Sequence, residues 1–90
     1  MLDIVLSNQF KKDLKLAKRR GLNLELMDTV VTKIANGEKL PANNKDHELT
    51  GDYKGFRECH IQPDWLLIYR VYNDELILFL TRTGSHSDLF

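Results

Sequence analysis

The sequence contains one cysteine, two prolines and one tryptophan among its 90 residues, and it has no long apolar run. A single thiol, Cys59, cannot form a disulfide within the chain, which excludes a disulfide-stabilised fold. The N-terminal region is polar and basic, so the sequence predicts neither a signal peptide nor a membrane span. These absences indicate a cytoplasmic protein that does not use a membrane.

An excess of charge of either sign is also absent, because 13 Lys and Arg residues balance 13 Asp and Glu residues. Global charge therefore does not predict a nucleic-acid partner. The distribution is uneven, since residues 11–20 carry a single acid, Asp13, and six basic residues: Lys11, Lys12, Lys15, Lys18, Arg19 and Arg20. The simplest interpretation of this basic run is the solvated face of a helix.

The chain length limits the number of hydrophobic cores. A second core would need roughly 50 more residues than the chain has. The hydrophobic content of 42% is enough for one core, and no low-complexity segment or internal repeat indicates disorder or a repeat protein. We therefore expect residues 1–90 to form a single domain.

The first half of the sequence predicts one strand and two helices. Residues 1–6 alternate in a pattern typical of a strand with one well-buried face, formed by Leu2, Ile4 and Leu6. Ser7 is the expected N-cap of a first helix that ends at Gly21, and Asn23 that of a second helix that ends at Gly37. Because the link is short, the two helices should form an antiparallel hairpin.

The second half predicts an exposed loop over residues 38–52 and then three strands, at 56–61, 65–72 and 76–81. Turns at 62–64 and at Asn73-Asp74, where positive φ is tolerated, should make these strands an antiparallel meander. The middle strand is apolar on both faces, so it should be central and covered on both sides. Residues 83–85 should break the last strand and leave a short tail, 86–90. The expected fold class is α+β.

Three histidines fall in three different segments: His47 in the loop, His60 at a strand end and His86 after the last strand. A meander can bring strand ends together at one edge of the sheet, where Asp64 and Arg82 are also expected. Such a group could cleave RNA without a metal. A base would take the ribose 2′-OH proton, a cation would stabilise the phosphorane, and an acid would protonate the leaving 5′ oxygen. Histidine suits both proton transfers, because its unperturbed pKa lies near neutrality.

Each of these residues also has an ordinary structural explanation when taken alone, as a loop, strand, turn or surface residue. A metal site is a competing hypothesis, but the sequence has no His-x-x-x-His or Cys-x-x-Cys spacing to favour it. A nucleophilic dyad of Cys59 and His60 is excluded, because neighbouring strand residues point to opposite faces.

Four sequence blocks, in order, carry a resemblance to a known family. They are residues 45–51 (KDHELTG), 55–61 (GFRECHI), 63–69 (PDWLLIY) and 82–90 (RTGSHSDLF). In these blocks and in its helix pair the chain resembles the RelE/ParE toxin superfamily, and most closely its YafQ-like branch. The resemblance implies a RelE-like fold and a ribosome-dependent endoribonuclease that cuts translated mRNA as the toxin of a type II toxin-antitoxin system.

The resemblance also implies roles for particular residues. His86 would be the general acid, His47 or His60 the base, Arg82 the stabiliser of the phosphate charge, and Asp64 the residue that orients or tunes a histidine. Phe90 would pack against a base of the mRNA. Further substrate-binding candidates are Trp65, Glu58 and Lys45, where Glu58 replaces an Asp found in some relatives. The basic residues of the first helix, from Lys11 to Arg20, would contact rRNA phosphates.

Two other functions remain possible at this point. A ParE-type toxin of the same superfamily would bind and inhibit a topoisomerase without acid-base chemistry. An isolated RNA-binding module would bind RNA and leave no cleaved ends. For the favoured hypothesis we expect a cognate antitoxin, the ribosome and mRNA as partners, and no metal or other cofactor.

Overall fold

A computed structural model describes every residue from Met1 to Phe90, and its fold is α+β as predicted. Helices α1 (Asn8–Arg19) and α2 (Leu24–Ala35) follow the first strand, and a single helical turn, α3 (His86–Leu89), follows the last one. The five strands form one sheet in the order β1-β5-β4-β3-β2. They are β1 (Asp3–Leu6), β2 (His47–Glu48), β3 (Arg57–Gln62), β4 (Trp65–Tyr72) and β5 (Ile77–Gly84).

The ends of α1 and α2 are those that the sequence predicts. The side chains of Ser7 and Asn23 each accept a hydrogen bond from a backbone N–H in the first turn of their helix. Gly21 and Gly37 follow the two helices with φ of +75°, a conformation that only glycine adopts without strain. Local capping chemistry therefore sets the length of both helices.

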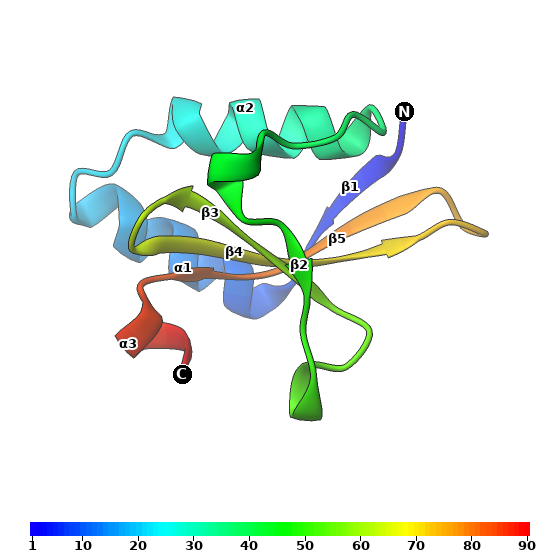
Figure 1. The fold of residues 1–90 in the computed structure, drawn as a ribbon. Helices are drawn as coiled ribbons and strands as arrows, with labels where there is room; N and C mark the ends of the chain where they lie inside the picture. The colour runs from blue at the N-terminus through cyan, green and yellow to red at the C-terminus, as the bar shows by residue number, and fades with distance from the viewer.

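Helices α1 and α2 bury one face of the sheet and leave the other to smaller elements (Figure 1). The main core lies under these helices and includes Phe10, Met27, Cys59, Leu67, Tyr69 and Leu78. On the opposite face, Leu89 of α3 packs on Leu66 and Ile68 of β4. Residues 65–69 are all buried. This arrangement confirms that β4 is central and covered on both faces.

The prediction for the first strand was only partly right. Leu2 and Leu6 pack against the core, but Ile4 is 42% exposed, so the strand does not have a well-buried face. The reason is its position, because β1 is an edge strand that pairs with β5 alone, in parallel. An edge strand with only one neighbour has less cover for its side chains.

Three details of the second half differ from the expectation. The segment 38–52 is not a plain exposed loop, since Leu40 is buried and His47 pairs with Glu58 as part of β2. Strand β5 does not break at residue 83 but continues to Gly84, because Thr83 pairs with Leu67 and is itself buried. The positive φ of the β4–β5 turn falls on residue 76 rather than on the preceding Asn-Asp pair. No helix is both long and apolar enough to span a membrane.

Candidate active site

The candidate site lies on the sheet face that α1 and α2 leave uncovered. Glu58 and His60 of β3 are paired with Ile68 and Leu66 of β4, and directly paired residues direct their side chains to the same face. His47 of β2 is paired with Glu58 and joins them from the neighbouring strand. The loop, the strand and the tail that carry the three predicted histidines therefore meet on one surface.

The site is a row of three imidazoles and two carboxylates. Oδ1 of Asp64 lies 2.7 Å from Nδ1 of His86, and the rings of His86 and His60 are 5.6 Å apart between centroids. Oε1 of Glu58 lies 3.7 Å from Nε2 of His60 and 3.8 Å from Nε2 of His47. Glu58 is 6% exposed, so its carboxylate faces the two imidazoles rather than solvent. Each histidine therefore has a carboxylate partner, and Glu58 serves two of them.

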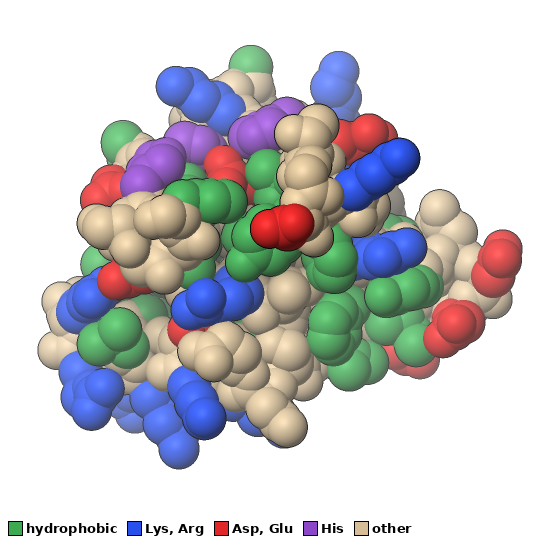
Figure 2. Space-filling view, turned by 90° about the horizontal axis from the view of Figure 1, so that it is seen from below, with side chains coloured by type: hydrophobic (Ala, Val, Ile, Leu, Met, Phe, Trp, Pro, Cys, Tyr) green, Lys and Arg blue, Asp and Glu red, His purple; other side chains and the backbone are tan.

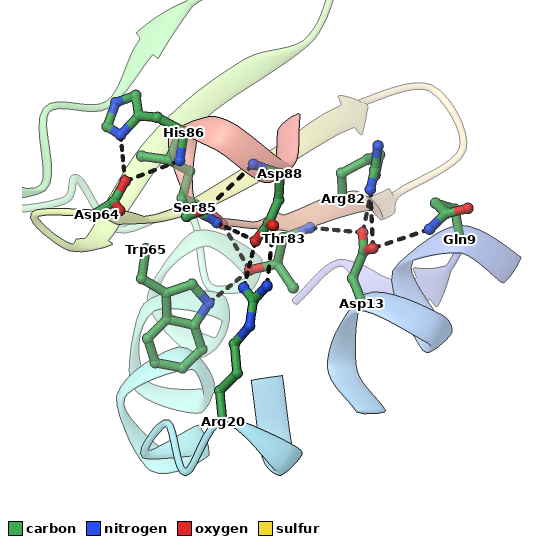
Figure 3. A network of polar contacts seen from close by, with 11 residues as sticks. Gln9, Asp13, Arg20, Asp64, Trp65, Arg82, Thr83, Ser85, His86 and Asp88 are labelled. Atoms are coloured by element: carbon green, nitrogen blue, oxygen red, sulfur yellow. Dashed lines mark hydrogen bonds and ion pairs between the residues drawn. The ribbon is translucent and has the colours of Figure 1, made fainter. Parts of the chain in front are cut away.

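The Asp64–His86 pair has a defined orientation (Figure 3). Oδ1 of Asp64 accepts a hydrogen bond from the backbone N–H of His86 as well as from its ring. These two bonds, the backbone one first, hold the pKa of Asp64 below its usual value. An ionised Asp64 requires the proton of the imidazole on Nδ1, which leaves Nε2 as the atom that can exchange a proton with a substrate.

His86 stands on a helical turn that is held in place from two directions. Ser85 and Asp88 form a reciprocal capping box at the start of α3. Asp88 also accepts hydrogen bonds of 2.6 and 3.2 Å from the guanidinium of Arg20, at the C-terminal end of α1 (Figure 3). Any side chain at Gly84 would place its Cβ 2.9 Å from Asp88, so a glycine is needed for this close approach. Four residues alone would not form a stable helix, so the helical turn depends on these contacts for its stability.

A β-bulge determines the face on which Arg82 lies. Tyr69 is paired with Leu80 whereas Ile68 is paired with Arg82, so Thr81 is an extra residue in β5. Without it, strand alternation would place Arg82 on the same face as Leu80, in the core under the helices. The inserted residue turns Arg82 to the open face, opposite Ile68.

Arg82 is held by an acid from α1. Oδ1 and Oδ2 of Asp13 accept hydrogen bonds of 3.1 and 3.0 Å from Arg82, and Oδ2 also accepts one of 3.2 Å from the backbone N–H of Thr83 (Figure 3). This contact lies where β1 has ended and β5 has no strand on that side. Burial would raise the pKa of Asp13, but the hydrogen bonds from Arg82, Gln9 and Thr83 outweigh it, so the pKa is lowered. Asp13 is therefore an ionised, buried partner for the Arg82 guanidinium.

A hollow of about 460 Å³ beside the histidine row could receive part of a substrate. Its lining includes Lys45, His60 and His86, together with the polar side chains of Asn43, Asn44 and Gln62. Nowhere in the chain do three His, Cys, Asp or Glu side chains converge in a geometry that could hold a metal ion.

The two aromatic residues predicted to bind substrate have different surroundings. Phe90 is 65% exposed and its ring lies 6.0 Å from that of Tyr53, so it is free to contact a ligand. Trp65 is 2% exposed, belongs to the core under the helices, and donates a hydrogen bond of 2.9 Å from its indole to the Thr83 hydroxyl. The prediction that Trp65 binds substrate is therefore wrong, because its ring points away from the site and supports β5 from the other face.

The basic residues of α1 are exposed, but they do not all have the same surroundings. Lys11, Lys12, Lys15, Lys18 and Arg19 are solvent-exposed. Arg20 is bound to Asp88, and this bond raises the pKa of its guanidinium. Arg20 therefore has a structural contact that the pattern of charges did not predict.

Sequence reasoning missed three residues that support the site: Asp13, Asp88, and Tyr53, whose ring lies against that of Phe90. Asp13 lies between Phe10 and Ala17, two buried residues of the apolar face of α1, and an acid on a buried face indicates a buried cation partner. That signal was available in the sequence. The Ser85-x-x-Asp88 spacing of a capping box was equally visible, whereas nothing in the sequence linked Asp88 to Arg20.

The comparisons with known proteins agree with this geometry. Residues 2–90 match the model of a family described as the bacterial toxin of type II toxin-antitoxin system, YafQ. The chain is similar to the mRNA interferase toxin YafQ of Escherichia coli strain K12. The two are 44% identical over 89 residues, which cover 98% of this chain and 95% of the relative.

Two solved structures extend the similarity to three dimensions. A metal-bound toxin from Helicobacter pylori superposes with a TM-score of 0.95 at 48% identity, and the match covers all of both chains. A chain of the E. coli DinJ-YafQ toxin-antitoxin complex superposes with a TM-score of 0.88 at 41% identity, over 99% of this chain and 97% of that one.

Proposed function

Because the chain belongs to the YafQ family of toxins of bacterial type II toxin-antitoxin systems, we propose that it is an mRNA interferase that cleaves translated mRNA on the ribosome. The observation that carries the proposal is the row of imidazoles and carboxylates, above all the Asp64–His86 pair at 2.7 Å with the His60 ring beside it. A single surface then offers both an acid and a base, which is what phosphodiester cleavage through the 2′-OH needs.

The proposed reaction uses two histidines in opposite protonation states. His60 or His47, oriented by Glu58, takes the proton from the ribose 2′-OH as the 2′ oxygen attacks the adjacent phosphorus. His86, as an imidazolium held by Asp64, gives a proton from Nε2 to the 5′ oxygen as the P–O bond breaks. The products are a 2′,3′-cyclic phosphate and a free 5′-OH. A carboxylate beside each imidazole stabilises its charged form during the transfer.

Binding groups surround this row. Arg82 stabilises the charge that develops on the phosphate oxygens. Phe90 stacks on a base, and Lys45, at the rim of the hollow, contacts the phosphate backbone. The exposed basic residues of α1, from Lys11 to Arg19, grip rRNA phosphates without reading sequence. The reaction requires no metal or other cofactor.

The partner that controls this activity is a cognate antitoxin protein, because the similar E. coli toxin has been crystallised with the antitoxin DinJ. A ParE-type toxin, which would inhibit a topoisomerase by binding alone, has no use for the paired imidazoles. The two hypotheses therefore differ in what happens when only proton transfer is removed.

The test is primer-extension mapping of mRNA ends on programmed ribosomes with the wild-type protein, His86→Gln and Asp64→Asn. We expect His86→Gln to lower the cleavage rate by about 100-fold or more, because a general acid contributes roughly that factor. Asp28→Asn, an exposed carboxylate of α2, is the matched control for loss of a carboxylate and should cut at the wild-type rate.

A parallel reaction with EDTA, at a magnesium level that keeps ribosomes intact, tests whether a transition metal is needed, since a similar toxin binds metal. Cleavage that survives chelation supports the acid-base mechanism. Absence of new ends with toxin-bound ribosomes would refute the nuclease proposal, and unchanged toxicity of His86→Gln would favour the ParE-type alternative.

A further inference from the structure

The face of the sheet that carries the histidines also carries a continuous series of aromatic side chains around one arginine. Phe90 lies against Tyr53 at 6.0 Å, and Tyr53 lies against Phe56 at 6.1 Å between ring centroids. The guanidinium carbon of Arg70 is 5.4 Å from the Phe56 ring and 4.9 Å from the Tyr72 ring. We call these five residues, Phe90, Tyr53, Phe56, Arg70 and Tyr72, the aromatic strip.

Strand alternation shows that the strip continues the active-site face. Arg70 and Tyr72 follow Leu66 and Ile68 at intervals of two residues along β4, so all four side chains point to the same side. In Figure 2 hydrophobic side chains with Lys and Arg among them extend from the histidines across this face toward acidic side chains at the far end. The strip therefore begins at the proposed base-stacking residue, Phe90, and ends on β4 at Arg70 and Tyr72, which lie about 7 Å apart along the strand at about 3.3 Å per residue.

Arg70 differs from the other arginines that pack within the fold. Arg20, Arg57 and Arg82 each form an ion pair with a carboxylate, whereas Arg70 forms none and its guanidinium lies over two rings. A Cβ at Gly55 would lie 3.3 Å from the Arg70 guanidinium, so the glycine leaves room for it beside the chain. A guanidinium that is oriented by two rings and has no carboxylate keeps its N–H donors for an external anion.

We propose that the aromatic strip is a binding track for single-stranded RNA that leads away from the scissile phosphate. Arg70 binds a backbone phosphate, and the rings of Tyr72 and Phe56 offer surfaces for the flanking bases. Alternation of a cation with aromatic rings is the arrangement by which proteins hold single strands without reading sequence. The acidic residues of the β4–β5 turn, Asp74 and Glu75, repel phosphate and mark the end of the track.

This inference rests on the proposed function, because it gives the substrate a path to the same site. Its test therefore measures binding without cleavage. The probe is a fluorescein-labelled 2′-O-methyl oligoribonucleotide, which lacks the nucleophilic 2′-OH, and affinity is measured by fluorescence anisotropy over a range of salt concentrations. The variants are Arg70→Gln, Arg70→Lys and Tyr72→Leu. Lys39→Gln, in the exposed segment after α2, removes one charge outside the strip and is the matched control.

Loss of one phosphate contact should reduce the slope of log K against log salt by about 0.7, which we expect for Arg70→Gln and not for Arg70→Lys or Lys39→Gln. Tyr72→Leu should weaken binding by roughly fivefold with an unchanged slope, because stacking does not depend on salt. The thermal midpoint of each variant shows whether it is folded, and Arg70→Lys keeps the charge if Arg70→Gln is less stable.

Two outcomes would overturn the proposal. One is equal affinity and equal salt slope for the wild-type protein and both Arg70 variants. The other is normal RNA affinity of Arg70→Gln with weakened binding of the cognate antitoxin, which would assign the strip to that protein. Neither outcome would contradict the proposed function, which is tested separately by cleavage of mRNA on ribosomes by the wild-type protein.

Discussion

The contact between Asp13 and Arg82 leads to a quantitative prediction. Asp13→Asn keeps the size of the side chain and an oxygen acceptor, but it removes the charge that faces the Arg82 guanidinium. The wild-type carboxylate accepts two hydrogen bonds from Arg82, one from the backbone N–H of Thr83 and one from the side-chain amide of Gln9. Asparagine has one oxygen and cannot accept all four hydrogen bonds, so at least one donor loses its partner.

The expected loss of stability follows from the burial of the pair. Breaking a fully buried ion pair costs about 3–5 kcal/mol, and a hydrogen bond to a charged group contributes about 1.5–3 kcal/mol. The Asp13 side chain is 7% exposed but that of Arg82 is 27% exposed, so water can partly replace the lost contact. We therefore expect Asp13→Asn to lower the free energy of unfolding by about 2 kcal/mol.

The assay is a double-mutant cycle of urea unfolding curves with Asp13→Asn, Arg82→Gln and the double variant. If the two side chains stabilise the fold through each other, the coupling energy should be about 1–3 kcal/mol. Asp28→Asn, in α2, is a control with no ion pair to Arg82. A coupling energy near zero would refute the reasoning, because it would mean that the two residues contribute independently.

The same contact predicts a dependence of stability on pH. The pKa of Asp13 is lower in the folded chain than in an unfolded one, so the contact stabilises the protein above the unfolded pKa, about 3.9. This part of the stability is lost as the pH falls through the lower, folded pKa. The difference in stability between wild type and Asp13→Asn should therefore shrink below about pH 4, as urea curves at pH 3 and pH 7 would show.

Further predictions concern the last helical turn and the lone thiol. Arg20→Gln should lower the rate of mRNA cleavage, by up to about 100-fold if His86 moves by about 1 Å, with little change in the thermal midpoint. A wild-type cleavage rate for Arg20→Gln would show that Asp88 holds the last helical turn in place without the Arg20 contact. Gly84→Ala should have a similar effect on cleavage because its Cβ would lie 2.9 Å from Asp88, and normal activity would mean that the turn can shift freely. Burial raises the pKa of the Cys59 thiol to about 12, so iodoacetamide at pH 8 should label the unfolded protein only. Mass spectrometry of native and urea-treated samples would detect the label, and labelling of the native sample would contradict this prediction.

The parts of the fold that could be predicted are those that local chemistry determines. The limits of β4, at Trp65 and Tyr72, agree with the prediction to the residue, because the apolar run lies between two clear turns. Both helices begin and end where Ser7, Asn23 and two glycines predict. In these segments the nearby residues of the sequence determine where each helix or strand begins and ends.

The parts that could not be predicted depend on partners that are distant in sequence. The bulge at Thr81 lies in the pairing of β5 with β4, just beyond the last residue paired with β1, and it leaves no mark in the sequence. Strand β2 has two residues and forms only because β3 offers it an edge. The resemblance assigned the indole of Trp65 to the site, but strand alternation directs it to the other face, into the core under the helices.

The parallel pairing of β1 with β5 has a consequence for when the protein becomes active during its own synthesis. Asp3 is paired with Ile77 and Leu6 with Leu80, so the first strand has no neighbouring strand until the fifth has been synthesised. His86 and Phe90 are made later still, and Asp13 and Arg20 meet their partners only at that time. A nascent chain that lacks the last strand therefore carries two of the three histidines but neither the Arg82 side chain nor the His86 side chain. Contacts of such long range make folding slow, and they tie the first appearance of activity to the synthesis of β5 and α3.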